Sequence, residues 1–126
     1  MAALGHACGR RDITSAYLAQ SVNTSPSFVR RVLAKLSRAG LVDTARGKAG
    51  ACWLARDAKK ISLRDIYEAV DAPKAFAIHA YSEQKGCAVS CHIKMALEKA
   101  LAKTQKAMEA GLDKINLAQI VADTEK

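Results

Sequence analysis

The chain has 126 residues, half of them apolar but only 5% aromatic, and it carries a formal net charge of +8. This length accommodates one compact domain or a small domain with a dimerisation arm, and a core poor in aromatic residues is typical of helical proteins. No apolar run approaches the roughly 20 residues that span a bilayer, and the first residues, MAALGHACGRR, lack the pattern of a signal peptide, so we expect a cytoplasmic protein.

The positive charge is concentrated in the first half of the chain. Residues 1–60 contain 11 Lys and Arg against 3 Asp and Glu, whereas residues 61–126 contain 9 of each kind. A basic first half suits a polyanionic partner such as DNA, and a neutral second half suits self-association. Chance asymmetry in a basic protein is the alternative interpretation.

Residues 13–40 predict two short helices joined by a tight turn. The hydroxyl of Thr14 or Ser15 can cap the first helix, because it accepts hydrogen bonds from amides of the first turn. The second helix begins at Ser25, which is followed by a proline, the residue best suited to the first helical position. It ends before Gly40, the residue expected just past a helix end.

The second of these helices has one apolar and one basic face. The apolar stripe consists of Val29, Val32, Leu33 and Leu36. A helix in a major groove contacts base edges and phosphates near its N-terminus. The candidate DNA contacts on this helix are therefore Ser25, Ser27, Phe28, Arg30, Arg31 and Lys35. An ordinary helical hairpin with a solvated basic face is the alternative.

The next segment, LVDTARGKAGACWLA, predicts a β-hairpin with a basic tip that contains glycines. Beside a helix-turn-helix such a hairpin is a wing, and Arg46 or Lys48 would then contact phosphates or enter a minor groove. A nucleotide-phosphate loop is a weak alternative, because neither G-x-x-x-x-G-K-[ST] nor G-x-G-x-x-G is present.

Helices are also expected after the hairpin. Ser62, with Asp65 three residues on, forms a capping-box pattern that begins a helix. A long helix from about residue 88 to 110 carries apolar residues at mixed spacings of three and four, as in helices that pair with another helix. Residues 115–120 predict a short capped helix, followed by a frayed polar tail from residue 122.

These elements predict a mainly α fold with a small β wing. We assign residues 1–71 to a winged helix-turn-helix DNA-binding domain, residues 72–86 to a connector, and residues 87–126 to a dimerisation helix and C-terminal tail. The long helix has little else in this chain to pack on, so pairing with a second copy is the economical solution. A two-fold homodimer would present two basic heads, which match a pseudo-palindromic operator in double-stranded DNA.

The order of motifs resembles a known family. The sequence S-P-S-F-V-R-R-V-L-A-K-L-S-R-A-G-L-V is followed by R-G-K-A-G-A-C-W-L-A, by I-S-L-R-D-I-Y-E-A-V, by a long helix and by I-N-L-A-Q-I. Over residues 13–121 the chain resembles the Rrf-two family of bacterial winged helix-turn-helix regulators, which includes iron–sulfur and nitric-oxide-sensitive members. The R-G-x-x-G and I-S-L-x-D-I-Y-x-A-V blocks are its most specific parts.

The resemblance implies a homodimeric transcription factor, usually a repressor. It maps the recognition positions onto Ser25, Ser27, Phe28, Arg30 and Arg31, and the wing positions onto Arg46, Gly47, Lys48 and Gly50. The chain departs from the family at Ala51, where a second wing glycine is usual, and its N-terminal helix is much shorter.

The cysteines mark the third departure from the family. Cluster-binding members carry three cysteines just before the long helix, whereas this chain has only Cys87 and Cys91 there. The segment C-A-V-S-C-H-I looks closer to the YwnA-like subgroup, in which no cluster site is evident.

The candidate sensor residues lie at the start of the expected long helix. Cys87 is expected at the N-terminus of the long helix, where the helix dipole favours the thiolate, and it is our candidate redox thiol. A bond to Cys91 becomes possible if Cys87 lies just outside the helix. A lightly buried, inert cysteine is the alternative, and Cys52 in the wing is more typical of packing.

A metal or iron–sulfur site using Cys87, Cys91 and His92, with His79 as a further ligand, is a disfavoured alternative. Two thiols at irregular spacing fall short of four ligands. We therefore expect no cofactor.

The sequence leaves three functions open for the whole chain. The preferred one is a homodimeric DNA-binding regulator, acting as a repressor, that responds to thiol oxidation or to a small ligand. A winged-helix adaptor that binds proteins rather than an operator is the second, and the basic face at Arg30 and Arg31 argues against it. An enzyme is the third, and no nucleophile–base arrangement or paired carboxylates support it.

Overall fold

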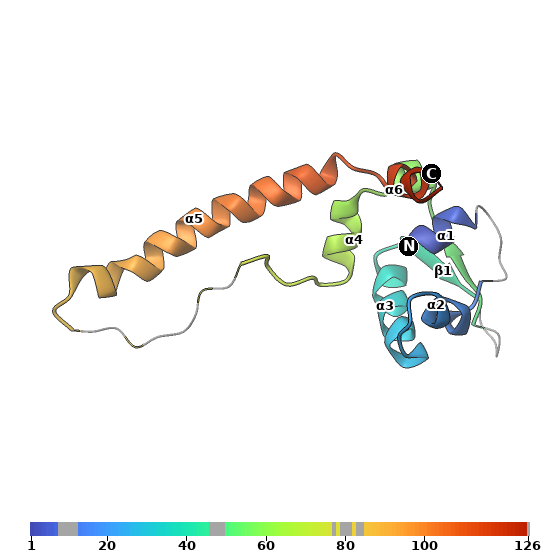
Figure 1. The fold of residues 1–126 in the computed structure, drawn as a ribbon, viewed down its shortest axis with the longest axis horizontal. Coiled ribbons are helices and arrows are strands. Elements are labelled where there is room, and N and C mark those ends of the chain that lie inside the picture. The colour runs from blue at the N-terminus through green and yellow to red at the C-terminus, as the bar shows by residue number, and fades with distance from the viewer. Residues whose placement is uncertain (8–12, 46–49, 77, 79–81, 83–84, 126) are drawn as a thin grey trace. The chain divides into compact units, whose positions relative to one another are not determined.

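The computed structural model describes residues 1–7, 13–45, 50–76, 78, 82 and 85–125 (Figure 1). The predicted wing contacts Arg46 and Lys48, together with Gly47, lie outside these described residues, as does His79. In chain order the elements are α1 (Ala2–His6), α2 (Ser15–Ser21), α3 (Pro26–Arg38), β1 (Val42–Thr44), β2 (Cys52–Leu54), η1 (Ala58–Lys60), α4 (Leu63–Ala69), α5 (Ala88–Asp113) and α6 (Leu117–Thr124).

The chain forms two compact units. Residues 1–72 and 112–126 make up the first, which we call the head, and residues 73–111 make up the second, the arm. The expected mainly α fold with a small β wing is confirmed, because the described strands form a two-stranded antiparallel hairpin beside helices.

The helix-turn-helix forms as its local sequence predicts. The Thr14 hydroxyl accepts a hydrogen bond from the Tyr17 N–H at 3.1 Å, and the Ser25 hydroxyl accepts one from the Phe28 N–H at 3.2 Å. Asn23 in the turn has a φ of 55°, a left-handed conformation that asparagine tolerates. These caps and the turn place α2 beside α3 (Figure 1).

The wing is anchored to the helices through its strands. Val42 pairs with Leu54 and Thr44 with Cys52 in the antiparallel register. The Cys52 N–H also donates to the Ile13 carbonyl at 2.7 Å, so the segment before α2 extends the hairpin. Val42 and Cys52 are fully buried, and they fix the base of the wing in the head core.

The C-terminal residues pack in the head, which differs from the expected division of the chain. The expected division groups residues 112–126 with the long helix, largely as its C-terminal tail, whereas here they belong to the head. The Leu117 N–H donates to the Ile61 carbonyl at 2.8 Å, and Leu117 is only 2% exposed. The expectation of a frayed tail from residue 122 is also wrong, because α6 continues to Thr124 and packs on α1. The capping box of Asn116 and Gln119 begins this helix, so local sequence and burial act together.

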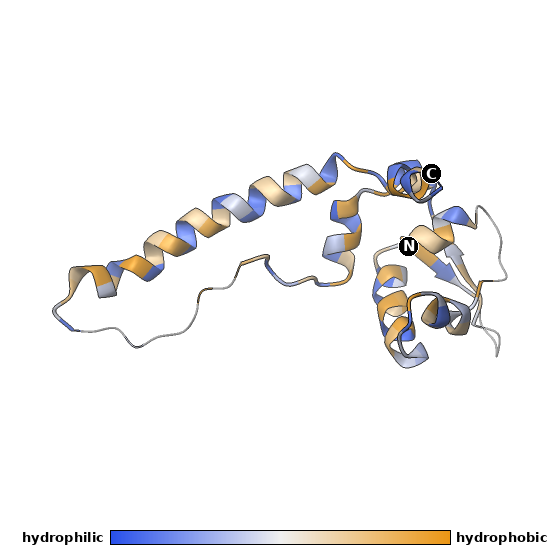
Figure 2. Cartoon of the chain, viewed as in Figure 1, coloured by the Kyte–Doolittle hydropathy of each residue, from blue (hydrophilic) through white to orange (hydrophobic). Residues whose placement is uncertain are grey.

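The arm contains most of α5, and this helix has no buried residue in the chain. Hydrophobic residues recur along it between hydrophilic ones, as the colouring in Figure 2 shows. The more exposed of them are Val89, Ile93, Met95 and Leu97. Despite its length, α5 is too polar to cross a membrane, and none of the other described helices combines the length and apolarity that spanning requires.

Candidate nucleic-acid interface

The N-terminal half of α3 is a polar, basic surface built on a buried stripe. One side of the helix packs in the head core through three side chains that are 2–8% exposed, Val29, Leu33 and Leu36. The other side is open to solvent, and its polar, basic and aromatic residues near the N-terminus are Ser25, Ser27, Phe28, Arg30 and Arg31. We call these five residues the α3 face. Because the buried stripe fixes the rotation of α3, the α3 face has one orientation relative to the head.

Two contacts order the long side chains of the α3 face. The Arg31 guanidinium lies over the Phe28 ring, 5.8 Å from its centroid, and the Arg30 Nη2 donates to the Ser27 hydroxyl at 3.3 Å. A guanidinium that is held before binding loses less conformational entropy when it contacts a base or a phosphate. Phe28 is 49% exposed, which leaves its outer edge available for an apolar contact.

Lys35 lies differently from the other residues expected to contact DNA. Its side chain is half-buried, and its Nζ donates to the Val70 carbonyl at 3.4 Å and lies 3.6 Å from the Asp71 carboxylate. Both partners lie at the C-terminal end of α4. The structure therefore uses Lys35 to join α3 to α4, and it does not bring Lys35 together with the α3 face.

A hollow of about 460 Å³ is lined by residues of α2, of α3 and of the segment from β1 to β2. Its polar lining includes Ser15, Arg30, Ser37 and Thr44. Sequence reasoning missed Ser15 and Thr44 as neighbours of Arg30, because their proximity depends on how the hairpin packs on the helices.

The sensor candidates lie at the start of α5, in the arm. Cys87 is exposed and immediately precedes the helix, and its Sγ accepts a hydrogen bond from the Ser90 N–H at 3.4 Å. Cys91 is half-buried, and both cysteines are thiols. His92 is exposed, and its Nδ1 lies 2.7 Å from the Ala88 carbonyl, a contact in which the ring nitrogen donates.

The described structure does not bring Cys87, Cys91 and His92 together as a group of metal ligands. Within the described part of the chain, no group of three or more His, Cys, Asp or Glu side chains is placed to hold a metal ion. The contact of the His92 Nδ1 with a backbone carbonyl also leaves only one nitrogen of that ring for a ligand role.

Cys52 is chemically unlike Cys87. It is fully buried, its Sγ donates to the Ile13 carbonyl at 3.5 Å, and burial raises the pKa of its thiol. A buried neutral thiol behaves as a small apolar residue, so Cys52 contributes to the packing of β2 in the core and is a poor candidate for a redox sensor.

Comparisons with known proteins agree with this geometry. The Rrf2 family, described as "Iron-dependent Transcriptional regulator", matches residues 1–123. YwnA of Bacillus subtilis strain 168, named as an HTH-type transcriptional regulator, is 35% identical over 109 residues, which cover 86% of this chain and 80% of YwnA. The HTH-type transcriptional regulator IscR of Cereibacter sphaeroides is 35% identical over 69 residues, covering 55% of this chain and 44% of IscR.

Solved structures share the fold. The structure of IscR from T. potens superposes with a TM-score of 0.68 at 23% identity, covering 98% of this chain and 78% of that one. The structure of CymR, the global cysteine regulator of B. subtilis, superposes with a TM-score of 0.67 at 21% identity, covering 96% and 86%. The chain belongs to the Rrf2 family of winged helix-turn-helix transcriptional regulators, and it is a DNA-binding protein.

Proposed function

We propose that this protein is a homodimeric repressor that reads a pseudo-palindromic operator with the α3 face of each copy. The observation that carries the proposal is the exposure of Ser25, Ser27, Phe28, Arg30 and Arg31 on a helix whose opposite side is buried. The two arginines supply bidentate donors for guanine or phosphate, and the Phe28 ring supplies an apolar contact for a thymine methyl group. Arg46 and Lys48 of the wing add phosphate contacts in this proposal.

Arg31→Ala tests the α3 face directly. We expect the substitution to weaken binding by about fivefold to 150-fold, because a good bidentate base contact contributes about 1–3 kcal/mol. The probe is a duplex that the protein itself enriches from a random pool, and affinity is measured by fluorescence anisotropy at several salt concentrations. Arg38→Ala is the matched control, since Arg38 is an exposed arginine at the other end of α3. Equal affinity of the Arg31 variant and the parent protein would refute the assignment.

The dimer in this proposal forms through α5. The side chains of Val89, Ile93 and Leu97 are 70%, 38% and 42% exposed and follow one another at four-residue intervals, so they form a continuous apolar line. Covering them with the same line of a second copy removes apolar surface from water in a self-complementary contact. The helix has 26 residues and is about 39 Å long, which provides several turns for such a contact.

Leu97→Asp tests the dimer. We expect a shift toward monomer in analytical ultracentrifugation, because a carboxylate would be buried without a partner. Ala102→Asp is the control, since Ala102 is exposed on α5 and lies away from that line. A Leu97 variant that remains as dimeric as the parent would remove α5 from the interface.

Cys87 is the sensor in this proposal. Its Sγ is exposed, immediately precedes α5 and accepts the Ser90 N–H at 3.4 Å, so it is accessible to an oxidant. With hydrogen peroxide as oxidant, the Cys87 sulfur attacks one peroxide oxygen as the thiolate, the O–O bond breaks, and sulfenic acid and hydroxide form. The hydroxide takes up a proton from solvent and becomes water. The family description names iron, but the described residues hold no metal-binding group, so we place no iron in this step.

The sensor test is a thiol count and a duplex-binding titration before and after peroxide. We expect the parent protein to lose one thiol reversibly and to change its DNA affinity, and Cys87→Ser to do neither. Absorption bands of a cluster after anaerobic purification would instead give Cys87, Cys91 and His92 a ligand role.

A further inference from the structure

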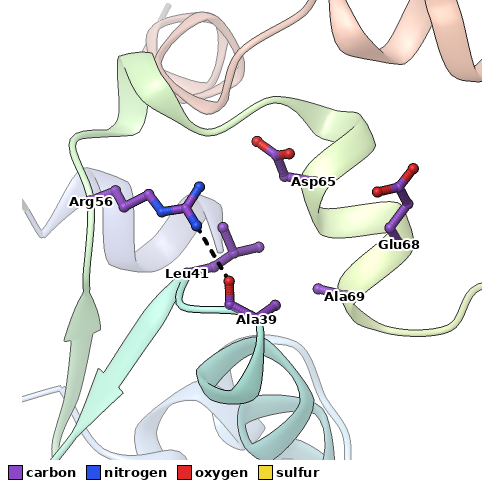
Figure 3. Close-up of a pocket in the computed structure, with 6 residues that line it drawn as sticks. All are labelled: Ala39, Leu41, Arg56, Asp65, Glu68 and Ala69. Atoms are coloured by element: carbon purple, nitrogen blue, oxygen red, sulfur yellow. Dashed lines mark hydrogen bonds between the residues drawn. The ribbon is translucent and has the colours of Figure 1, made fainter.

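A second hollow in the head lies beyond the C-terminal end of α3, away from the α3 face. Its volume is about 250 Å³, and it is lined by Ala39, Leu41, Arg56, Asp65, Glu68 and Ala69. Figure 3 shows Arg56 reaching in from the segment after β2, and Asp65 pointing toward it from α4. The apolar part of the lining comes from Leu41, which is 1% exposed, and from the two alanines.

The charged side chains that line this hollow do not pair with one another, and each keeps hydrogen-bonding groups for a further partner. The Arg56 Nη2 donates to the Ala39 carbonyl at 3.4 Å, and no ion pair joins Arg56 to either carboxylate among these described side chains. One Asp65 oxygen accepts the Ser62 N–H at 3.0 Å, and one Glu68 oxygen accepts from the Arg64 Nε at 2.9 Å. Each carboxylate therefore retains a second oxygen, and Arg56 retains further donors.

We propose that this hollow binds a small zwitterion that carries a carboxylate and an ammonium group, such as an α-amino acid. The guanidinium of Arg56 is the partner for the ligand carboxylate, because its planar donors match that group. The second oxygens of Asp65 and Glu68 are the partners for the ammonium. A ligand with both charges pairs with both walls at once, whereas an ion of one sign pairs with only one of them.

The hollow lies where a bound ligand would affect the packing of α3 on α4. Ala39 is the C-cap of α3, and α4 is joined to the same helix by Lys35. A ligand that bridges Arg56 and α4 would stabilise the arrangement of α3 and α4 in which it binds. It would therefore shift the equilibrium between this arrangement and any other toward the bound one. This role as a signal depends on the proposed function, but the binding itself does not.

Nuclear magnetic resonance titration of the full-length protein tests the binding. The probes are glycine, L-alanine and L-serine, with sodium acetate and methylammonium chloride as ions of one sign, all at constant ionic strength. We expect amide shifts at residues 39–41 and 65–69, and at least one amino acid should bind about tenfold or more tightly than either ion.

Two substitutions identify the partners. Arg56→Gln and Glu68→Gln should each weaken amino-acid binding by about tenfold, the usual size for losing a charge-assisted contact. Lys59→Gln is the control, because Lys59 is an exposed cation three residues from Arg56 that does not line the hollow.

Two results would overturn the proposal: amino acids that bind no better than acetate or methylammonium, or an Arg56 variant with unchanged affinity. The spectrum of each variant shows that it is folded. Duplex binding is measured separately, so loss of DNA binding with amino-acid binding retained would refute only the proposed function.

Discussion

Gly5 in α1 provides a sharp test of how the C-terminal residues pack. A Cβ built on Gly5 would lie 2.7 Å from the Val121 Cγ2 of α6, closer than real Cβ contacts allow. Alanine normally stabilises a helix relative to glycine by up to about 1 kcal/mol. Here the overlap should cost about 1–3 kcal/mol, because valine is stiff at χ1 and cannot turn away cheaply. We therefore expect Gly5→Ala to lower the free energy of unfolding by about 1–2 kcal/mol.

The reasoning predicts a change of sign in a second background. In Val121→Ala the obstructing methyl group is gone, so adding Gly5→Ala should leave the free energy of unfolding unchanged or raise it by up to about 1 kcal/mol. Gly111→Ala is the matched control, since Gly111 lies in α5 with no described atom within 4 Å of the added Cβ, and it should be stabilising.

The assay is urea denaturation of the four proteins of this cycle and of the control, followed by circular dichroism at a fixed protein concentration. Equal effects of Gly5→Ala in the two backgrounds would refute the contact between α1 and α6. They would also refute the placement of residues 112–126 in the head.

Three further predictions concern single side chains. Lys35→Ala should reduce duplex affinity less than Arg30→Ala in the same anisotropy titration, because the ammonium of Lys35 contacts the C-terminal end of α4. A larger loss of affinity for the Lys35 variant would show that Lys35 contacts DNA. Iodoacetamide at pH 7 should label Cys87 well before Cys52, as peptide mass spectrometry would show, because burial raises the pKa of the Cys52 thiol. Because the pKa of Cys52 is higher in the folded than in the unfolded protein, the neutral thiol contributes to the free energy of unfolding. This contribution is fully present below the unfolded pKa and is lost as the pH rises through the folded pKa. Ser62→Ala should lower the free energy of unfolding by about 1 kcal/mol, since it removes the hydroxyl that accepts the Asp65 N–H at 3.0 Å; no change in the denaturation midpoint would contradict the capping box.

Local signals in the sequence determined most of the helix boundaries. Ser25 with its proline, Asn23 in the turn and the Ser62 capping box specify backbone conformations through contacts within four residues, so they could be recognised without the fold. The same holds for the exposed basic side of α3, because a buried stripe at helical spacing implies which residues remain outside.

What only the tertiary structure decided depends on residues far apart in the chain. Three such features require a particular packing of one element on another. They are the hydrogen bond between Ile61 and Leu117, the contact of Lys35 with the end of α4, and the position of Arg56 and Asp65 in one hollow. No local pattern specifies such packing, because it follows from the burial of apolar side chains by the whole head. The sequence by itself therefore determined the helix-turn-helix and its basic face, whereas the fold decided that the last fifteen residues complete the head and that a charged hollow lies beyond the C-terminal end of α3.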